Sequence, residues 1–120
     1  MRSKTEVAIG LMAKPKYAVT NTNSLPWQEL EDFAGVEVKS LGIANGQTME
    51  LFRFAPNTPF PEHVHAGPEF VFLMEGRARL SGQWLETGWS SIGEAGTVDS
   101  DFLSGEKGCI LLAVYTPQKT

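Results

Sequence analysis

His63-Val-His65-Ala-Gly-Pro-Glu69 is the stretch that decides the fold of this 120-residue chain, and it holds the only two histidines. On a β-strand, residues two apart share a face, so both imidazoles would converge on one point. Imidazole nitrogen is a ligand suited to zinc, iron, copper and nickel. The turn formed by Ala-Gly-Pro is placed to fold the Glu69 carboxylate back toward the histidines. The spacing alone leaves two interpretations open: a metal site, or two surface histidines on an edge strand with Glu69 capping a turn.

Two spaced patterns extend this stretch. Six residues separate Glu69 from Gly76, and a later pattern runs from Gly88 through Glu94-Ala-Gly96 to Asp99. Together they resemble the two motifs of the cupin family, in which histidines, a glutamate and spaced glycines surround a metal inside the barrel. The resemblance implies an all-β, single-domain cupin, that is, a double-stranded β-helix or jelly-roll barrel. It implies metal ligation by His63, His65 and Glu69, with Asp99 in the fourth ligand position.

The second pattern departs from the family in two places, and three further segments narrow the resemblance. Glu94 replaces the usual proline, and Asp99 replaces the usual third histidine. The segments Ser24-Leu-Pro-Trp27, Gly35-Val-Glu-Val-Lys39 and Glu106-Lys-Gly-Cys109-Ile-Leu-Leu make residues 20–116 similar to ChrR-type cupins. Such domains are fused to an anti-sigma module in a singlet-oxygen response, and also occur in acetylacetone-cleaving dioxygenases. No His or Cys precedes His63, so we expect a standalone domain without the zinc-binding anti-sigma module.

Turn residues punctuate the chain about every ten positions from Gly35 onward, among them many of its twelve glycines and seven prolines. The short runs between them are rich in β-branched and aromatic residues, which is typical of a sandwich or barrel. Strands are predicted over 36–43, 48–55, 69–75, 77–81, 89–93 and 109–115. One short helical turn is predicted over 24–32 (SLPWQELED), with Ser24 as its cap. Residues 1–20 are predicted to be an extension, a strand or disordered, and residues 21–120 the barrel.

Composition excludes several classes of partner and location. Fourteen acidic and ten basic side chains give a net charge of −4, which argues against nucleic acid and anionic membranes as partners. The single cysteine, Cys109, cannot form an internal disulfide, so a reducing compartment is expected. The apolar stretch 7–13 is too short for a membrane span and too closely flanked by charges for a signal peptide. We therefore expect a cytoplasmic protein, whose natural start is either Met1 or Met12.

The ligand set determines which metals and reactions are possible. If Asp99 ligates, two imidazoles and two carboxylates neutralise a divalent ion, and iron or manganese gains over copper. Zinc held tetrahedrally by all four groups has no open position and is structural. If Asp99 faces solvent instead, His63, His65 and Glu69 match the two-histidine, one-carboxylate set of iron oxygenases. The predicted cofactor is one divalent ion, namely iron, manganese or zinc, with nickel as a further candidate.

Three functions remain open at this point. The first is a metal-dependent, oxygenase-type enzyme that acts on a small organic substrate. The second is an oxidant- or ligand-sensing regulatory cupin of the ChrR kind, with a structural metal. The third is a metal-free binding barrel. Family habit and the open sheet edges predict a homodimer.

Other reactive side chains have simpler interpretations. Cys109 begins an apolar run and is expected to be a buried packing residue. Asp101 is expected in a solvated acidic turn. Arg77 and Arg79 share a strand face, as salt-bridged surface residues or as the lining of a pocket for an acidic substrate. The surface is the favoured interpretation.

Overall fold

The computed structural model describes residues 15–117, and within them the chain forms nine β-strands and one short 3₁₀ helix. The predicted all-β class is therefore confirmed. In chain order the elements are η1 (Thr22–Ser24), β1 (Gln28–Glu29), β2 (Val36–Ala44), β3 (Gln47–Phe54), β4 (His63–Val64), β5 (Glu69–Leu80), β6 (Gln83–Leu85), β7 (Ser90–Gly93), β8 (Val98–Asp99) and β9 (Leu103–Tyr115).

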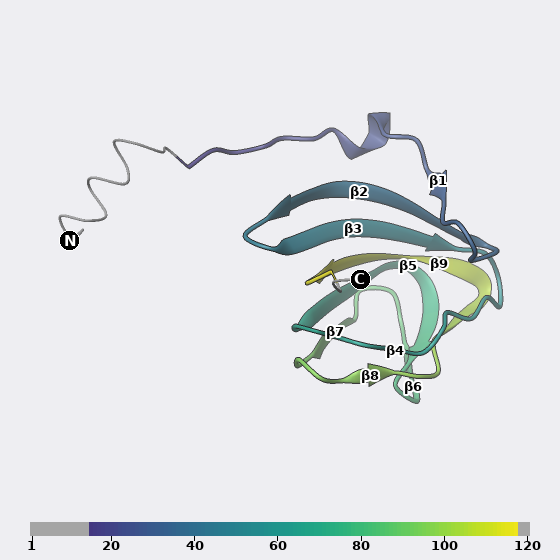
Figure 1. The fold of residues 1–120 in the computed structure, drawn as a ribbon. Coiled ribbons are helices and arrows are strands. Elements are labelled where there is room, and N and C mark those ends of the chain that lie inside the picture. The colour runs from purple at the N-terminus through teal and green to yellow at the C-terminus, as the bar shows by residue number, and fades with distance from the viewer. Residues whose placement is uncertain (1–14, 118–120) are drawn as a thin grey trace.

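The strands build two antiparallel sheets that face each other. The larger sheet has the order β1-β2-β3-β9-β5-β6, and β7 pairs with β5. The strands β4 and β8 form a separate two-stranded sheet. In Figure 1 the larger sheet curls, and β4 and β8 lie across the barrel from β2 and β3. This layering leaves an interior that both sheets line, as a jelly-roll barrel requires.

The inward-pointing side chains change from polar to apolar along the larger sheet. Residues paired directly across strands point to the same face, so strand register gives the composition of each inner row. The end nearest Glu69 is polar, and the rows beyond it form the buried core together with Phe54 and Phe102. Across β5, β9 and β3, the successive inner rows are Glu69, Tyr115 and Thr48; Val71, Ala113 and Glu50; and Leu73, Leu111 and Phe52.

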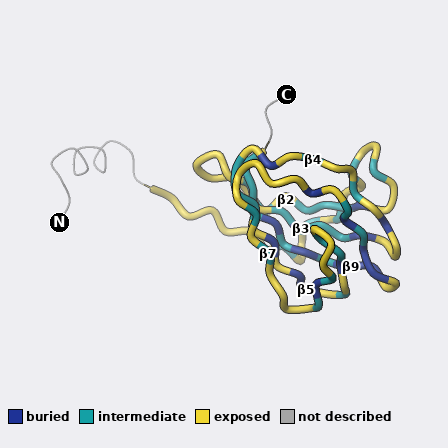
Figure 2. Tube along the Cα trace, turned by 90° about the horizontal axis from the view of Figure 1, so that it is seen from below, coloured by how far each residue is buried: buried dark blue, intermediate teal, exposed yellow. Residues whose placement is uncertain are grey.

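The outer face of the same sheet is apolar but uncovered by the described part of the chain. Phe70, Phe72 and Met74 alternate with the buried residues of β5, and between 41% and 46% of each is exposed. Figure 2 follows this change between buried and exposed positions along the strands. The predicted homodimer would need such a surface, but a single chain does not test it, and the homodimer stays a prediction.

Two strands are several residues longer than the sequence predicts, and four short strands were not predicted. The segments 69–75 and 77–81 join into one strand, β5, because bulges on both sides of Gly76 bend the strand without ending it. Strand β9 begins at Leu103 instead of residue 109. The unpredicted strands β1, β4, β6 and β8 have two or three residues each, which is too short for a periodic pattern to reveal.

The predicted short N-terminal helical turn is present, but its predicted bounds, 24–32, are wrong. The only helical turn among the described residues is Thr22–Ser24, and its cap is Asn21, whose side chain accepts a hydrogen bond from the Asn23 amide. Residues Gln28–Glu29 instead pair with β2 as an edge strand. A nine-residue helix is marginal by itself, so the strand pairing offered by β2 prevails. The Trp27 ring holds this segment in place, with Lys39 Nζ at 4.8 Å and the Arg53 guanidinium at 4.5 Å.

The predictions for the N-terminus fall largely outside the described residues. This applies to the alternative start at Met12 and to most of the predicted extension over 1–20. Residues 15–21 are exposed and carry no strand or helix. Among residues 15–117, no helix is long and apolar enough to cross a membrane.

Candidate metal centre

The small sheet brings the candidate ligands together. His63 on β4 pairs directly with Asp99 on β8, so both side chains point to the same face. The pairing continues past the strand ends, where His65 N–H donates to the Thr97 carbonyl at 3.0 Å and Gly96 N–H donates to the His65 carbonyl at 2.8 Å. Only Val64 lies between the two histidines, so His65 points the same way as His63. Backbone pairing alone therefore positions all three side chains.

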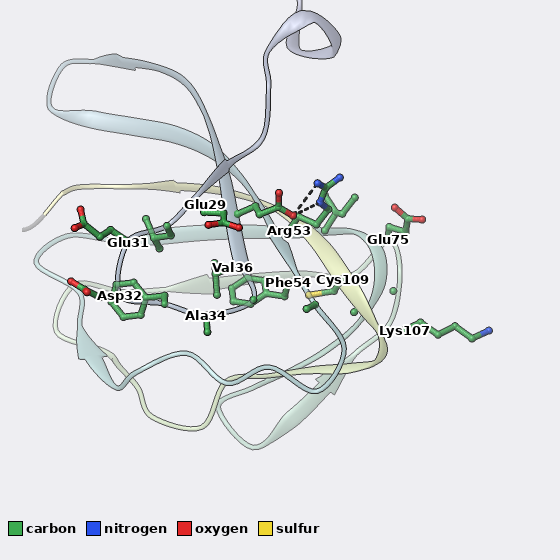
Figure 3. A pocket seen from close by; sticks show the side chains of 18 residues that line it. Glu29, Glu31, Asp32, Ala34, Val36, Arg53, Phe54, Glu75, Lys107 and Cys109 are labelled. Carbon is green, nitrogen blue, oxygen red and sulfur yellow. Dashed lines mark hydrogen bonds and ion pairs between the residues drawn. The ribbon is translucent and has the colours of Figure 1, made fainter.

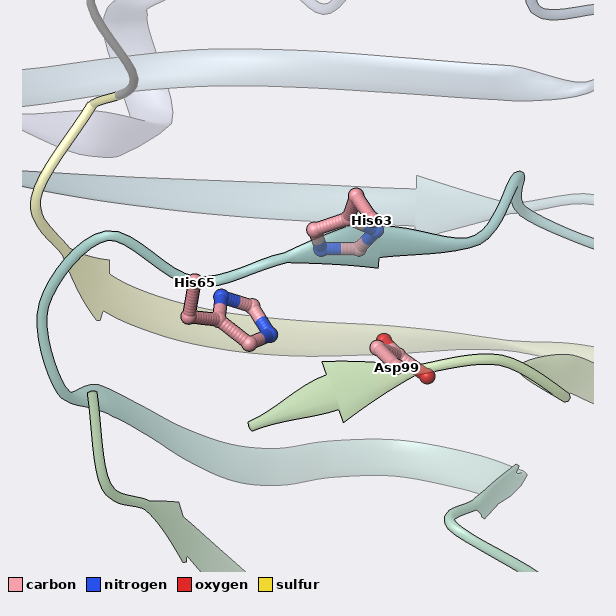
Figure 4. A group of neighbouring side chains, drawn as sticks. All are labelled: His63, His65 and Asp99. Atoms are coloured by element: carbon pink, nitrogen blue, oxygen red, sulfur yellow. The ribbon is translucent and has the colours of Figure 1, made fainter. Parts of the chain in front are cut away.

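His63, His65 and Asp99 form a compact donor cluster. One potential ligand atom from each lies within 4.8 Å of the other two. The imidazole centroids are 4.7 Å apart and the rings stand at 75° to each other (Figure 4). Two atoms bonded to one zinc-sized ion are at most about 4 Å apart, so small side-chain rotations suffice to close the cluster around an ion.

Hydrogen bonding leaves one potential ligand atom free on His63 and one on Asp99. His63 Nδ1 lies 3.0 Å from the Pro61 carbonyl, which can only accept, so this contact favours the tautomer with the proton on Nδ1 and a lone pair on Nε2. Asp99 is 9% exposed, and its Oδ1 is buried with no hydrogen-bond partner in the described part of the chain. An unpaired buried carboxylate oxygen is costly, and a cation would satisfy it. The donor set therefore fits a divalent metal ion. The alternative in which Asp99 faces solvent is wrong.

The environment adjusts the protonation of the cluster. Burial, and then the proximity of His63, lower the pKa of His65, which favours the neutral imidazole that a metal needs. Burial raises the pKa of Asp99; His63 opposes this shift and Asp101 adds to it. Burial in this site therefore disfavours the charged forms of His65 and Asp99, and a bound cation would favour the ionised carboxylate of Asp99.

Glu69 lies beside the cluster and contacts only one member. It begins β5 after the turn 66–68, and its Oε1 lies 3.4 Å from His65 Nε2. Gly67 allows this turn to pack closely, because a Cβ there would lie 2.6 Å from Thr116 Oγ1. Burial, together with the negative charge of Asp99, raises the pKa of Glu69 to about 7, although His63 opposes the shift. Glu69 is thus placed either as a fourth ligand or as a carboxyl group that holds a proton beside the metal.

The cluster opens into a cavity of about 370 Å³ inside the barrel. Most of its wall is aliphatic and aromatic, and none of its lining residues is a lysine or an arginine. The volume suits a small organic molecule. The polar lining residues are Glu50, His63, His65, Glu69, Asp99, Tyr115 and Thr116.

Sequence reasoning missed the pair Glu50 and Tyr115 in this wall. Tyr115 O–H donates a hydrogen bond to Glu50 Oε1, and both residues lie on the inner face of the larger sheet. One signal was available: Glu50 is the only charged residue among the alternating positions of β3 that share its face, Thr48, Phe52 and Phe54. Its partner could not be identified, because 65 residues separate the two.

A larger hollow, of about 1360 Å³, is open and is a weaker candidate for the functional site (Figure 3). It runs from the loop after β1 to the bend of β9, and it has no histidine among its lining residues. Its arginine, Arg53, is paired with Glu37 at 2.9 Å. We therefore assign the chemistry to the smaller cavity with the histidines.

The remaining reactive side chains lie outside the cavity. Arg77 pairs with Glu86 at 2.7 Å, and Arg79 Nε donates to the Asp101 carbonyl at 3.1 Å. Both arginines form ion pairs near the surface, as the favoured interpretation predicts, and neither lines the cavity of the candidate metal centre. Cys109 is 4% exposed, and burial raises its pKa to about 12, so it is confirmed as a packing residue.

The Glu69→Gln variant should change how the stability of the metal-free protein depends on pH. A folded-state pKa of about 7, against an ordinary 4.5, means that the folded protein binds this proton more tightly than the unfolded chain. The free energy of unfolding should then fall by up to about 3 kcal/mol as pH rises from 4.5 to 7. Glu69→Gln removes this decline. After chelator treatment, the variant should therefore have a higher free energy of unfolding than the wild type at pH 8 but not at pH 4.

Urea unfolding of both chelator-treated proteins at these two pH values measures the effect. Glu106→Gln, which neutralises an exposed carboxylate on β9, is the matched control and should leave the pH dependence intact. Equal pH dependence in the wild type and Glu69→Gln would contradict the assignment.

Comparison with known proteins supports the same architecture. The family model described as "ChrR Cupin-like domain" matches residues 15–119. No curated protein matches the chain. An acetylacetone dioxygenase from Acinetobacter johnsonii superimposes with a TM-score of 0.72 at 16% identity, covering 87% of this chain and 75% of the other. KdgF from Halomonas sp. gives 0.73 at 15% identity, covering 87% and 96%.

A regulatory protein shares the fold as well. A chain from the Rhodobacter sphaeroides complex of SigE with the anti-sigma ChrR gives a TM-score of 0.69 at 18% identity, covering 96% of this chain and 67% of the other. At such identities the likeness establishes the jelly-roll fold and not the activity. The same architecture thus occurs in an enzyme and in a regulatory complex.

Proposed function

Because this chain belongs to the ChrR cupin-like domain family, we propose that it is a metal-dependent enzyme of the oxygenase type that acts on a small organic substrate. The observation that carries the proposal is the opening of the His63, His65 and Asp99 cluster into a cavity of about 370 Å³. A structural metal needs no such space beside it, whereas a catalytic metal needs room for a substrate.

In this proposal each side chain of the centre has one task. His63 and His65 offer neutral nitrogen atoms, and Asp99 offers the buried oxygen that lacks a partner. A bound iron or manganese ion supplies the Lewis-acid and redox chemistry that the side chains lack. Glu69, with a pKa raised to about 7, can hold or release a proton beside the substrate. The apolar walls exclude water from the reacting groups.

Oxygen consumption by the iron-loaded protein tests this function. Fe(II) is loaded anaerobically, and oxygen uptake is followed with a panel of small diketones and phenols. We expect uptake that depends on both iron and substrate, and its loss when His63 and His65 are replaced by alanine. Glu62→Gln, which changes an exposed carboxylate next to β4, is the control and should retain uptake.

The opposite result would favour the regulatory function. Stoichiometric zinc in the purified protein, with no open coordination position and no oxygen uptake across the panel, would overturn the enzyme proposal. A centre that includes Glu69 as the fourth ligand is the arrangement that would close such a site.

A further inference from the structure

The cavity has a second polar wall, which faces the candidate metal centre from the larger sheet. Tyr115 lies on the inner face of β9 directly opposite Glu69 on β5, and Glu50 lies in the next inner row, on β3. His63, His65 and Asp99 belong to the loop and strands of the small sheet on the other side. All five residues line the same cavity, so a molecule bound beside the metal also meets the wall formed by Glu50 and Tyr115.

The wall presents only hydrogen-bond acceptors. Tyr115 uses its single O–H to donate to Glu50 Oε1. Burial, and then the hydrogen bond to Glu50, raise the pKa of Tyr115, so the hydroxyl keeps its proton and remains a donor to Glu50. What remains available to a ligand is the second oxygen of Glu50 and the lone pairs of the Tyr115 oxygen. A polar ligand group that contacts this wall must therefore donate a hydrogen bond to it.

The charged residues around the cavity also disfavour an anionic ligand. Glu50 forms no ion pair within residues 15–117, and no lysine or arginine lines the cavity. Arg53 on β3 and Arg79 on β5 do not line the cavity. They form ion pairs with Glu37 and Asp101. Apart from a metal ion bound at the opposite wall, no cation lies beside Glu50 to compensate a carboxylate or phosphate that meets it, which is unfavourable in a partly desolvated site.

We propose that Glu50 and Tyr115 determine substrate specificity, and that they select an electrically neutral molecule with an apolar body and a hydroxyl, enol or amide donor. The inference rests on the proposed function, because it assumes that the substrate occupies the cavity beside the metal. The apolar body would lie against the inner rows beyond the wall, where Phe52, Val71 and Leu111 line the cavity. Glu50 accepts the donor, and Tyr115 is a positioning residue that orients the carboxylate.

Three probes of similar size separate the contributions of donor and charge. Phenol is neutral and donates, anisole is neutral and does not donate, and benzoate is anionic. Their dissociation constants are measured on Mn(II)-loaded protein from the relaxation of the probe protons, which also reports their distance from the metal. The wild type should bind phenol about tenfold more tightly than either anisole or benzoate, as expected for a hydrogen bond to a charged acceptor.

Two conservative variants locate the effect. Glu50→Gln removes the charge and keeps an oxygen for Tyr115, so the preference for phenol over benzoate should fall about tenfold. Tyr115→Phe leaves the carboxylate unoriented, so the preference for phenol over anisole should fall several-fold. Glu106→Gln and Tyr17→Phe make the same chemical changes at exposed positions and should leave all three constants unchanged. Manganese content should be the same in every variant, since neither wall residue is among the candidate ligands.

The outcomes distinguish this inference from the function on which it rests. If the wild type binds benzoate as tightly as phenol, or if Glu50→Gln leaves their ratio unchanged, the specificity wall is overturned while the metal centre stands. If fully manganese-loaded wild type binds none of the probes, both the wall and the substrate cavity are overturned.

Discussion

Replacing Asp99 by alanine should lower the affinity for Mn(II) or Fe(II) by at least about 100-fold, which is the upper end of what the loss of a residue supporting a ligand costs. The variant loses the only carboxylate of the three-residue donor cluster and leaves two neutral imidazoles. The oxygen that it removes is buried and has no hydrogen-bond partner among residues 15–117. Relieving that unpaired oxygen should also make the metal-free variant at least as stable as the metal-free wild type.

Asp99→His should behave differently, because it restores a third imidazole at this position. The variant should retain a divalent ion, but without the Asp99 charge its preference should move from iron and manganese toward zinc and copper. The measurement is elemental analysis after dialysis against equimolar metals, followed by chelator competition. Asp101→Ala is the matched control: its Oδ1 is also buried without a partner, but its Oδ2 accepts from the Gly82 amide at 2.7 Å. Unchanged metal content in Asp99→Ala would remove Asp99 from the ligand set.

The largest effect on stability is expected at Gly76, where β5 crosses β9. A Cβ at this position would lie 2.2 Å from the Gly108 carbonyl oxygen and 3.0 Å from the Cys109 Cα. Both are backbone atoms of the neighbouring strand, so no side-chain rotation relieves the clash. The φ of Gly76 is also +80°, a conformation that a residue with a side chain adopts only under strain. Gly76→Ala should therefore lower the free energy of unfolding by more than about 3 kcal/mol, well above the typical cost of a single substitution.

Gly88→Ala separates backbone strain from steric clash. Its φ of +90° is similar, but a Cβ there would meet nothing within 4 Å. This control should cost about 1–2 kcal/mol, the usual penalty for a side chain in that conformation. Urea unfolding of both variants gives the comparison, and a Gly76→Ala variant found only in inclusion bodies alongside a soluble Gly88→Ala agrees with the expectation. Equal destabilisation by the two substitutions would show that the close approach of β5 and β9 is not rigid.

Most of the fold could be predicted from local patterns, and the wrong predictions lie where pairing with a neighbouring strand overrides those patterns. The breaks at glycine and proline separated the strands, because those residues interrupt regular backbone structure. The exceptions are instructive: Gly76 bends β5 without ending it, and the segment around Trp27 pairs with β2 instead of forming a helix. In both cases a neighbouring strand supplies the hydrogen bonds, and the segment's own residues do not encode that neighbour.

The candidate site, too, was predicted in part from local sequence and depends in part on the tertiary structure. The spacing of His63 and His65 by itself determined that both imidazoles share a face, because side chains on a strand repeat every two residues. Only the tertiary structure decided that Asp99 faces His63, that Glu69 contacts only His65 within the donor cluster, and that Glu50 on β3 meets Tyr115 on the neighbouring strand β9. Those juxtapositions depend on the register between strands far apart in the chain. That register follows from the packing of the whole barrel, and no short stretch of sequence contains it.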